Sequence, residues 1–319
     1  NHPLDSYLTD CKRVLIAGAG GGFDVFAGLP LYFALREQGY EVHLANYSFV
    51  NFGAAKLISR PQILIDTMLI GARGGVIREY DYYPEGFLAQ WFEQERGEGA
   101  TGWMFNRVGV LALLTAYRTL VEHLGGVDAI ILVDGGVDAL MRGDETGPGT
   151  LLEDSISLAA VEVLEGVRVK ILANLGFGTE VEEAVCHHHA LENIAALAME
   201  GAFWGGCALT PQMEAFQLYE AACRYVWEQP THYRSHISTR VIPAVQGHFD
   251  GYRMYDDPEM PAFLSPLMSL YWFTDAQAVA RRNLLIEELR DTYTFDDASR
   301  AMMAYRMQVD LRPRKNIPY

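Results

Sequence analysis

Short apolar runs that end in clustered glycines are the feature of this sequence that most limits how the chain can fold. The first run covers residues 14–17 and leads into the glycine-rich segment 18–22, and the runs at 129–133 and 167–173 end in the same way. An apolar run that stops at glycines is typical of a buried strand. Because helical patterns follow these runs, strands alternate with helices, which predicts a mostly parallel α/β sheet.

Other segments of the first half have the periodicity of helices and strands. Helices are predicted over residues 25–38, 108–123 and 150–164, and a strand over residues 41–45. Thr150 and Glu153 have the spacing of a capping box, which predicts that the third helix begins there. The segment 59–100 is less regular and is compatible with strands over 67–70 and 76–80 and a helix over 87–95.

The second half of the chain differs in character. Helical patterns cover residues 181–199, 212–227, 275–289 and 296–308. Residues 235–246 are rich in β-branched and apolar side chains, which predicts one long strand. No linker rich in proline, glycine or serine separates the halves, so we expect residues 181–319 to pack on residues 1–180 as one compact unit. The predicted fold class is α/β: a Rossmann-like, mostly parallel sheet flanked by helices, with a helix-rich second half packed on it.

Charge and composition limit the partners that this chain can have. Lys and Arg number 25 and Asp and Glu number 41, which gives a formal net charge of −16. A surface that acidic repels nucleic-acid phosphates and anionic lipids. The longest mostly apolar run, residues 108–116, is far shorter than the ~20 residues that cross a bilayer, and the four cysteines form no disulfide scaffold or zinc motif. We therefore expect a soluble, cytoplasmic protein that binds neither nucleic acid nor membranes; a homo-oligomer is compatible with the sequence.

Loops at the ends of the predicted strands point to a ligand site. In a parallel α/β sheet, ligands bind beyond the carboxyl ends of the strands. The loops 18–24, 134–145 and 174–180 and the polar segment 46–48 all follow predicted strands. The ligand-binding residues predicted at this sheet edge are Gly18, Gly20, Gly21, Gly22, Asn46, Asp134, Gly135, Gly136, Arg142, Asp144, Glu145, Asn174, Gly176 and Gly178.

The first of these loops resembles a dinucleotide loop only in part. Glycines let main-chain N–H groups approach a ligand closely. The dinucleotide fingerprint is GxGxxG, and Phe23 stands where its third glycine is required. Asn46 occupies the position of the ribose-binding acid, and Asp24 would repel a phosphate. A nucleoside, nucleotide or sugar is therefore favoured over NAD(P) or flavin, and a purely structural turn is the alternative interpretation.

The second loop is dense in carboxylates. Its apolar segment 139–141 predicts that it packs against the protein, and packed carboxylates need partners. These partners are a divalent cation held through oxygen atoms, Arg142, or the hydroxyls of a ligand. A solvated acidic turn is the alternative interpretation.

A short repeat, GGxD, occurs at residues 21–24 and 135–138, each time after a predicted strand. Its acids, Asp24 and Asp138, are therefore our candidates for catalytic acid and base or for cation binding. Glu153 and Asp154 fall in a predicted first helical turn, where the helix dipole accounts for acidic side chains. These two residues are assigned to structure.

Three consecutive histidines, at 187–189, lie in a helical pattern. Leu191, Ile194 and Ala198 share a helix face with His187, so His187 is predicted to point inward and the other two sideways. A core histidine is the favoured interpretation, and His187 is also our third catalytic candidate. The HExxH spacing of zinc enzymes is absent.

Several longer strings resemble a prokaryotic family catalogued as domain of unknown function 1152. They are GAGGGFD (18–24), LVDGGVDALMRGDE (132–145), GT with ED (149–154), HHALENIAALAMEGAFWGG with LTPQM (188–213), and SPLMSLYWF (265–273). The resemblance implies a Rossmann-like α/β fold. It supplies no reaction.

The residues favour an enzyme that acts on a small polar metabolite, nucleoside-, nucleotide- or sugar-like. The expected chemistry is hydrolysis, elimination or group transfer assisted by carboxylates or a divalent metal, and the sequence does not specify a cofactor. The alternatives are an NAD(P)- or flavin-dependent oxidoreductase and a non-catalytic protein that binds a metabolite or assembles.

Overall fold

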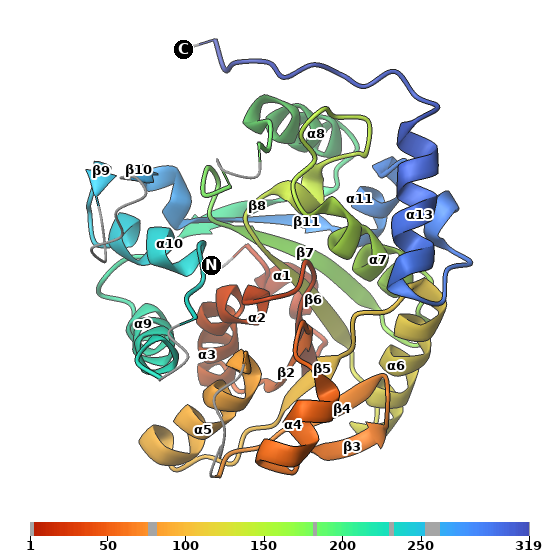
Figure 1. The fold of residues 1–319 in the computed structure, drawn as a ribbon. Helices are drawn as coiled ribbons and strands as arrows, with labels where there is room; N and C mark the ends of the chain where they lie inside the picture. The colour runs from red at the N-terminus through yellow and green to blue at the C-terminus, as the bar shows by residue number, and fades with distance from the viewer. Residues whose placement is uncertain (1–2, 76–81, 181–183, 230–232, 253–261, 319) are drawn as a thin grey trace.

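A twisted nine-stranded sheet forms the centre of the molecule, with helices on both faces (Figure 1). The computed structural model describes residues 3–75, 82–180, 184–229, 233–252 and 262–318. The strands in chain order are β1 (Arg13–Gly18), β2 (Glu41–Tyr47), β3 (Gln62–Ile65), β4 (Leu69–Ala72), β5 (Gly102–Phe105), β6 (Ala129–Gly135), β7 (Val169–Leu175), β8 (Phe203–Ala208), β9 (Asp250–Tyr252), β10 (Ala262–Leu264) and β11 (Leu270–Asp275). The predicted α/β fold class is confirmed.

The strand order of the large sheet is β3-β4-β5-β2-β1-β6-β7-β11-β8. Its five central strands, from β5 to β7, are parallel, and Gly18 pairs with Asn46 on one side and Val133 on the other. After β1, the chain places β2 and then β3, β4 and β5 on one side of β1, and it returns to the opposite side of β1 as β6. The order therefore reverses between β1 and β6, and such a reversal is where open α/β sheets bind ligands.

Helices complete the two outer layers. They are α1 (Asp5–Leu8), α2 (Asp24–Ala27), α3 (Leu29–Glu37), α4 (Phe52–Ser59), α5 (Pro84–Arg96), α6 (Val110–His123), α7 (Leu151–Glu162), α8 (His187–Met199), α9 (Glu214–Trp227), α10 (Ser238–Val245), α11 (Ala276–Arg282), α12 (Ile286–Leu289) and α13 (Phe295–Arg306), with 3₁₀ turns at Asp138–Leu140 and Pro266–Ser269.

Alternating side chains on the central strands create two cores. On β1, Val14 and Ile16 point to the core beneath α2, α3, α5 and α9, and Leu15 and Ala17 point to the core beneath α6, α7 and α11. In Figure 1 these two helix groups lie on opposite sides of the sheet. Burial on both faces explains why the parallel strands are continuous apolar runs.

The second half of the chain extends the same sheet. Strand β11 pairs antiparallel with β7, and β8 pairs antiparallel with β11. Two other strands of this half, β9 and β10, form a separate small hairpin. The helices predicted over 87–95, 108–123 and 212–227 are confirmed as α5, α6 and α9.

The strand predicted over residues 235–246 is wrong, because this segment contains helix α10. Its β-branched residues Val241, Ile242 and Val245 have helical spacing and lie together in the core. The Ser235 hydroxyl accepts the Ser238 N–H at 3.0 Å, which supports a helical turn. Burial of this face outweighs the strand propensity of the individual residues.

Two predicted helices are each divided in two. The helix over 25–38 is interrupted at Gly28, where a methyl group would come within 2.6 Å of Ile16. Two residues later, Pro30 has no N–H for an intrahelical bond. The helix over 275–289 is interrupted at Asn283, whose side chain donates to the Ser155 hydroxyl at 2.8 Å. In both places the helix ends at a residue that makes a tertiary contact, although the sequence pattern continues to favour a helix.

The remaining boundaries shift by a few residues. The strand expected over 67–70 is β4, at 69–72. Helix α8 begins at His187, later than the predicted 181, and residues 181–183 lie outside the described residues. The strand expected over 76–80 also lies outside them.

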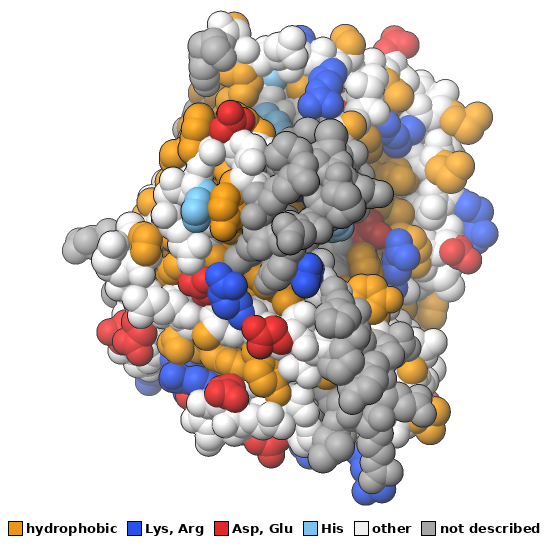
Figure 2. Space-filling model, turned by 60° about the vertical axis from the view of Figure 1, so that its left-hand side comes forward, with side chains coloured by type: hydrophobic (Ala, Val, Ile, Leu, Met, Phe, Trp, Pro, Cys, Tyr) orange, Lys and Arg blue, Asp and Glu red, His pale blue; other side chains and the backbone are white. Residues whose placement is uncertain are grey.

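The surface charges, the helices and the cysteines of the structure can be compared with what the composition predicts. On the face shown in Figure 2, acidic and basic side chains of the described residues are interspersed with apolar ones. Among the described residues, no helix has the length and apolar character needed to span a bilayer. All four cysteines are free thiols.

Candidate functional site

A pocket of about 270 Å³ opens at the carboxyl ends of β1 and β6, where the strand order reverses. It is lined by residues 20–24, Phe49, Tyr82, Asp134, Gly135, Asp138, Thr150, Glu180 and residues 233–237. A larger hollow of about 740 Å³ lies at the opposite end of β2, where the Arg36–Glu98 ion pair lines it. The smaller pocket is lined by four carboxylic acids, Asp24, Asp134, Asp138 and Glu180, and it is therefore the candidate site.

Asp24 connects the glycine loop after β1 to the end of β6. Its carboxylate accepts the Gly20 N–H at 2.6 Å and the Gly135 N–H at 3.2 Å. A methyl group at Gly20 would come within 2.9 Å of both Asp24 Oδ2 and Asp154 Oδ1, and one at Gly135 within 3.0 Å of Asp24 Oδ1. These two glycines therefore make room for carboxylates of the protein itself.

Asp134, the penultimate residue of β6, lies at the centre of the group. Its Oδ2 accepts the Asn174 side-chain N–H at 2.6 Å and the Ala139 N–H at 3.1 Å. Asn46, at the end of β2, instead donates to the Gly22 carbonyl at 2.9 Å and to Glu85 at 2.7 Å. Asn174 and Asn46 thus hold the acids and the glycine loop in place.

Asp138 and Glu180 complete the cluster on the β7 side. Glu180 accepts the N–H groups of Val137 at 2.6 Å and Asp138 at 3.2 Å. Gly136, with φ of +131°, passes so close to Glu180 that a methyl group there would overlap its carboxyl carbon. Asp138 Oδ2 accepts the Thr150 hydroxyl at 2.6 Å and its N–H at 2.7 Å. The predicted capping box is wrong, because the Thr150 hydroxyl bonds to Asp138 rather than to the first turn of α7.

Asp154 is the residue that the sequence analysis assigned to structure, and the structure places it in the cluster. Its side chain is 0% exposed, and within the described part of the chain neither carboxylate oxygen has a hydrogen-bond partner. Leaving a buried carboxylate without partners is costly. Neighbouring Glu153 differs, since it accepts a bond from Arg107 at 2.6 Å.

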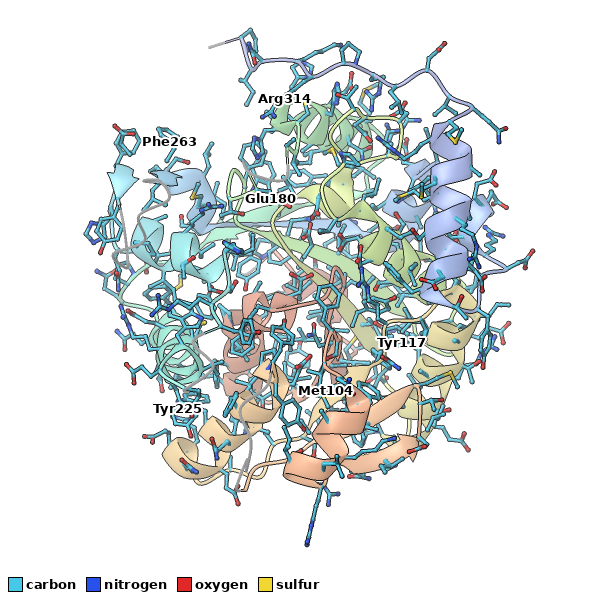
Figure 3. The ribbon with its side chains drawn as sticks, viewed as in Figure 1. Met104, Tyr117, Glu180, Tyr225, Phe263 and Arg314 are labelled. Atoms are coloured by element: carbon cyan, nitrogen blue, oxygen red, sulfur yellow. The ribbon has the colours of Figure 1, made fainter. Side chains whose placement is uncertain are left out.

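The five acids form two overlapping groups of three. One group is Asp24, Asp134 and Asp154, and the other is Asp134, Asp138 and Glu180; within each, one oxygen per residue lies within 4.8 Å of the others. Burial, followed by the charge of neighbouring Asp138, raises the pKa of Asp134, Asp154 and Glu180 well above its ordinary value. Carboxylate oxygens are the ligands that Mg²⁺, Mn²⁺ and Ca²⁺ prefer. Figure 3 shows Glu180 in the interior of the molecule, whereas Phe263 and Arg314 lie at its periphery.

Comparison with protein families gives a match over residues 104–312, to the family described as "Protein of unknown function (DUF1152)". The chain belongs to this family. The matched segment contains four of the five clustered acids, and only Asp24 precedes it. No match was found for the DUF1152 chain among curated proteins or among solved structures.

The structure does not bring every predicted site residue of this DUF1152 protein to the pocket. Asp144 and Glu145 pair with Arg312 near the C-terminus, each at 2.9 Å, and Arg142 donates from Nε to the Arg282 carbonyl at 3.2 Å. Asp144 and Glu145 form a separate ionic cluster with Arg312, which ties their loop to the end of the chain.

Of the remaining predicted glycines, some line the pocket and others do not. Gly21 and Gly22 line the pocket, and a methyl group at Gly21 would overlap the Phe49 ring. Gly18 lies under Asn46, where a methyl group would overlap Asn46 Oδ1. Gly176 and Gly178 have φ of +104° and +95° and shape the loop after β7 without lining the pocket.

The histidines lie on α8, away from the pocket lining. His189 is the buried member at 2% exposure, whereas His187 is half-buried with its ring 5.1 Å from that of Phe177. The prediction that His189 points sideways is wrong. Helix α8 begins only at His187, and its buried face contains His189, Asn193 and Leu197.

Aromatic side chains that the sequence analysis missed surround the mouth of the pocket. Tyr82 and Tyr233 meet edge to face at 5.1 Å, and Phe49 and Tyr233 are 40% and 50% exposed. Arg234 and His236 lie beside them. These residues come from separate loops, so no local pattern could have grouped them.

Proposed function

We propose that this protein is an enzyme acting on a small polar metabolite, nucleoside-, nucleotide- or sugar-like, by divalent-metal-assisted hydrolysis, elimination or group transfer. The observation that carries the proposal is Asp154, a fully buried carboxylate whose oxygens have no hydrogen-bond partner among the described residues. It faces Asp24 and Asp134 in one group of potential ligands. A bound cation would give its charge a partner.

The charge of the buried acids supports a bound cation in particular. The side chains of Asp134, Asp138, Asp154 and Glu180 are at most 2% exposed. Within the described residues, none of these four takes part in a salt bridge with Lys, Arg or His, whereas Asp144 and Glu145 both do. Buried carboxylates are neutralised by protons, by basic side chains or by metal ions. Because the described residues give these acids no basic partner, we take a divalent cation as the neutralising group. It would also supply chemistry, since it polarises a substrate oxygen and activates water.

The first loop argues against a dinucleotide at this edge of the sheet. The Gly20 and Gly135 N–H groups, which could have contacted a pyrophosphate, donate to Asp24 instead. A pyrophosphate there would also face the carboxylates of Asp24 and Asp134. This arrangement favours the metal-assisted classes over hydride transfer.

The mouth of the pocket supports a substrate with a flat ring. Exposed aromatic side chains such as Phe49 and Tyr233 offer faces or edges on which a ring can pack. Arg234 and His236 on the same rim suit an anionic or hydroxyl-rich portion of a ligand. Among the three expected classes, the rim therefore favours a nucleoside or nucleotide.

The proposal is tested by cation-dependent stability and turnover. After EDTA treatment, thermal unfolding is recorded with and without Mg²⁺ or Mn²⁺; a ligand at ~100 times its Kd adds about 2.7 kcal/mol. We expect an upward shift of the midpoint of several degrees, taking ~2–4 °C per kcal/mol, and cation-dependent turnover of at least one nucleoside, nucleotide or sugar phosphate.

Asp154→Asn should abolish turnover and reduce the shift of the midpoint. Asp144→Asn, which removes the same charge outside the pocket, should retain them. The proposal is wrong if neither cation shifts the midpoint, or if Asp154→Asn responds as the native protein does. Binding of cation and metabolite without turnover would instead support a non-catalytic role.

A further inference from the structure

We infer that the cluster holds two divalent cations, with the Asp134 carboxylate as the ligand that both share. This inference rests on the proposed function, because it requires that the cluster binds a cation at all. It goes further by assigning each acid to one of two neighbouring positions.

The arrangement of the acids supports two positions rather than one. Asp134 is the only residue common to both groups of potential ligands, with Asp24 and Asp154 in one and Asp138 and Glu180 in the other. A carboxylate has two oxygens and can ligate one cation with each. Asp134 lies at the end of β6, and Asp138 follows the same strand, whereas Asp24 follows β1, Glu180 follows β7 and Asp154 belongs to α7. The two groups therefore meet at one shared ligand.

Charge also supports two cations. Four of the acids, Asp134, Asp138, Asp154 and Glu180, have side chains at most 2% exposed. One divalent cation would leave two of these four negative charges unbalanced in the interior, and two cations balance all four. Partly exposed Asp24, which accepts two N–H groups, is then the one ligand of the five whose charge water can screen.

Buried oxygens at the cluster lack partners among the described residues. They are both oxygens of Asp154, in the first group, and Oδ1 of Asn174, whose Nδ2 donates to the shared Asp134. Protein donors fix Asp138, Glu180 and Asp134: Thr150, the N–H groups of Val137, Asp138 and Ala139, and the Asn174 side chain. The carboxylates are thus already oriented, as a preformed cation site requires.

The number of cations bound decides the inference. The full-length protein, treated with EDTA and dialysed against Mn²⁺, is assayed for manganese per chain in about 0.5 M salt, which screens loose binding to the acidic surface. We expect two Mn²⁺ per chain, and an electron paramagnetic resonance spectrum of an exchange-coupled pair.

Variants assign the two positions. Asp154→Asn and Glu180→Gln should each bind one Mn²⁺ and give the spectrum of an isolated ion, because each removes a ligand of one position only. Asp134→Asn should lose the coupled signal, and Asp144→Asn should bind two ions as the native protein does. Circular dichroism checks that each variant is folded.

One Mn²⁺ in the native protein, with Glu180→Gln unchanged, would overturn the two-cation inference and leave the proposed function intact. No bound Mn²⁺ in the native protein would overturn both. Two uncoupled ions, still bound after Asp134→Asn, would show that Asp134 is not shared.

Discussion

At the residue scale, the acids of the pocket differ from ordinary surface carboxylates because burial opposes their charge. The pKa of Asp134, Asp154 and Glu180 is raised by desolvation first and by neighbouring carboxylates second. A group whose folded pKa exceeds its unfolded pKa contributes stability that is fully present below the unfolded pKa. That contribution is lost as the pH rises through the folded pKa. Without cations, the fold is therefore weakened on the alkaline side of the ordinary carboxyl range, near pH 4.

Replacing the carboxyl group of Asp154 by an amide should remove its share of this loss of stability at higher pH. In EDTA at pH 7–8, Asp154→Asn is expected to raise the free energy of unfolding by about 1–2 kcal/mol, because the amide does not ionise in the unfolded chain and so loses no charge on burial. The gain should shrink as the pH is lowered toward 4, where Asp154 of the native protein is protonated. Urea unfolding at several pH values measures it, and a loss of stability at pH 8 would contradict the assignment.

At the element scale, the pocket depends on close approach between loops that follow different strands. Gly136 follows β6 and touches Glu180, which follows β7. Gly20 follows β1 and touches Asp154 from α7. Helix α10 lies next to the pocket-lining residues 233–237, with Ser235 bonded into its first turn. The geometry of the site is therefore a property of how these elements pack.

Substitution of Gly136 should disturb both stability and the cluster. Gly136→Ala adds a methyl group that overlaps Glu180 at a φ of +131°, so we expect a loss of about 2–4 kcal/mol from strain and overpacking and weaker cation binding. Gly39→Ala is the matched control, since Gly39 has φ of +92° with no atom within 4 Å of the added group. It should cost only about 1 kcal/mol and leave cation binding unchanged. Equal losses in the two variants, measured by denaturant unfolding, would argue against the close contact with Glu180.

At the scale of the whole molecule, the end of the chain is tied to the loop after β6. Arg312 pairs with Asp144, Glu145 and Glu192, and it also bonds through its backbone, accepting from Thr146 and donating to Asp144. Glu145 is 1% exposed and also accepts the N–H groups of Arg142 and Gly143. The loop that carries Asp138 is thus anchored by a residue far away in the sequence.

Loss of the Arg312 side chain should destabilise the protein without changing the cation site. Arg312→Ala leaves the buried Glu145 without its basic partner. We expect a cost of about 1–3 kcal/mol, below the ~3–5 kcal/mol of a fully buried pair because the Arg312 side chain is 26% exposed. Arg300→Ala, which breaks an exposed pair with Asp297, should cost at most about 0.5 kcal/mol. Thermal unfolding compares the two variants, and a cost for Arg312→Ala no larger than that for Arg300→Ala would refute the anchoring role.

Strands and loop residues that depend on adjacent residues could be predicted from the sequence. The strands β1, β6 and β7 are apolar runs that stop at glycine, and the GGxD repeat marked Asp24 and Asp138, which both line the pocket. Asp154 was missed because an acid in a first helical turn has an ordinary local explanation. A signal existed, since apolar residues surround it in α7, but it was not used.

By itself, the sequence determined the α/β class, the order of most elements and the loops that hold the acids, because these follow from the periodicity and turn chemistry of adjacent residues. Only the tertiary structure decided which acids converge. Asp138 and Glu145 lie in one loop, yet Asp138 joins Glu180 and Asp134 while Glu145 pairs with Arg312. That division depends on strand order and on which side chains become buried together. These are contacts between residues far apart in the chain, and the local sequence pattern does not predict them.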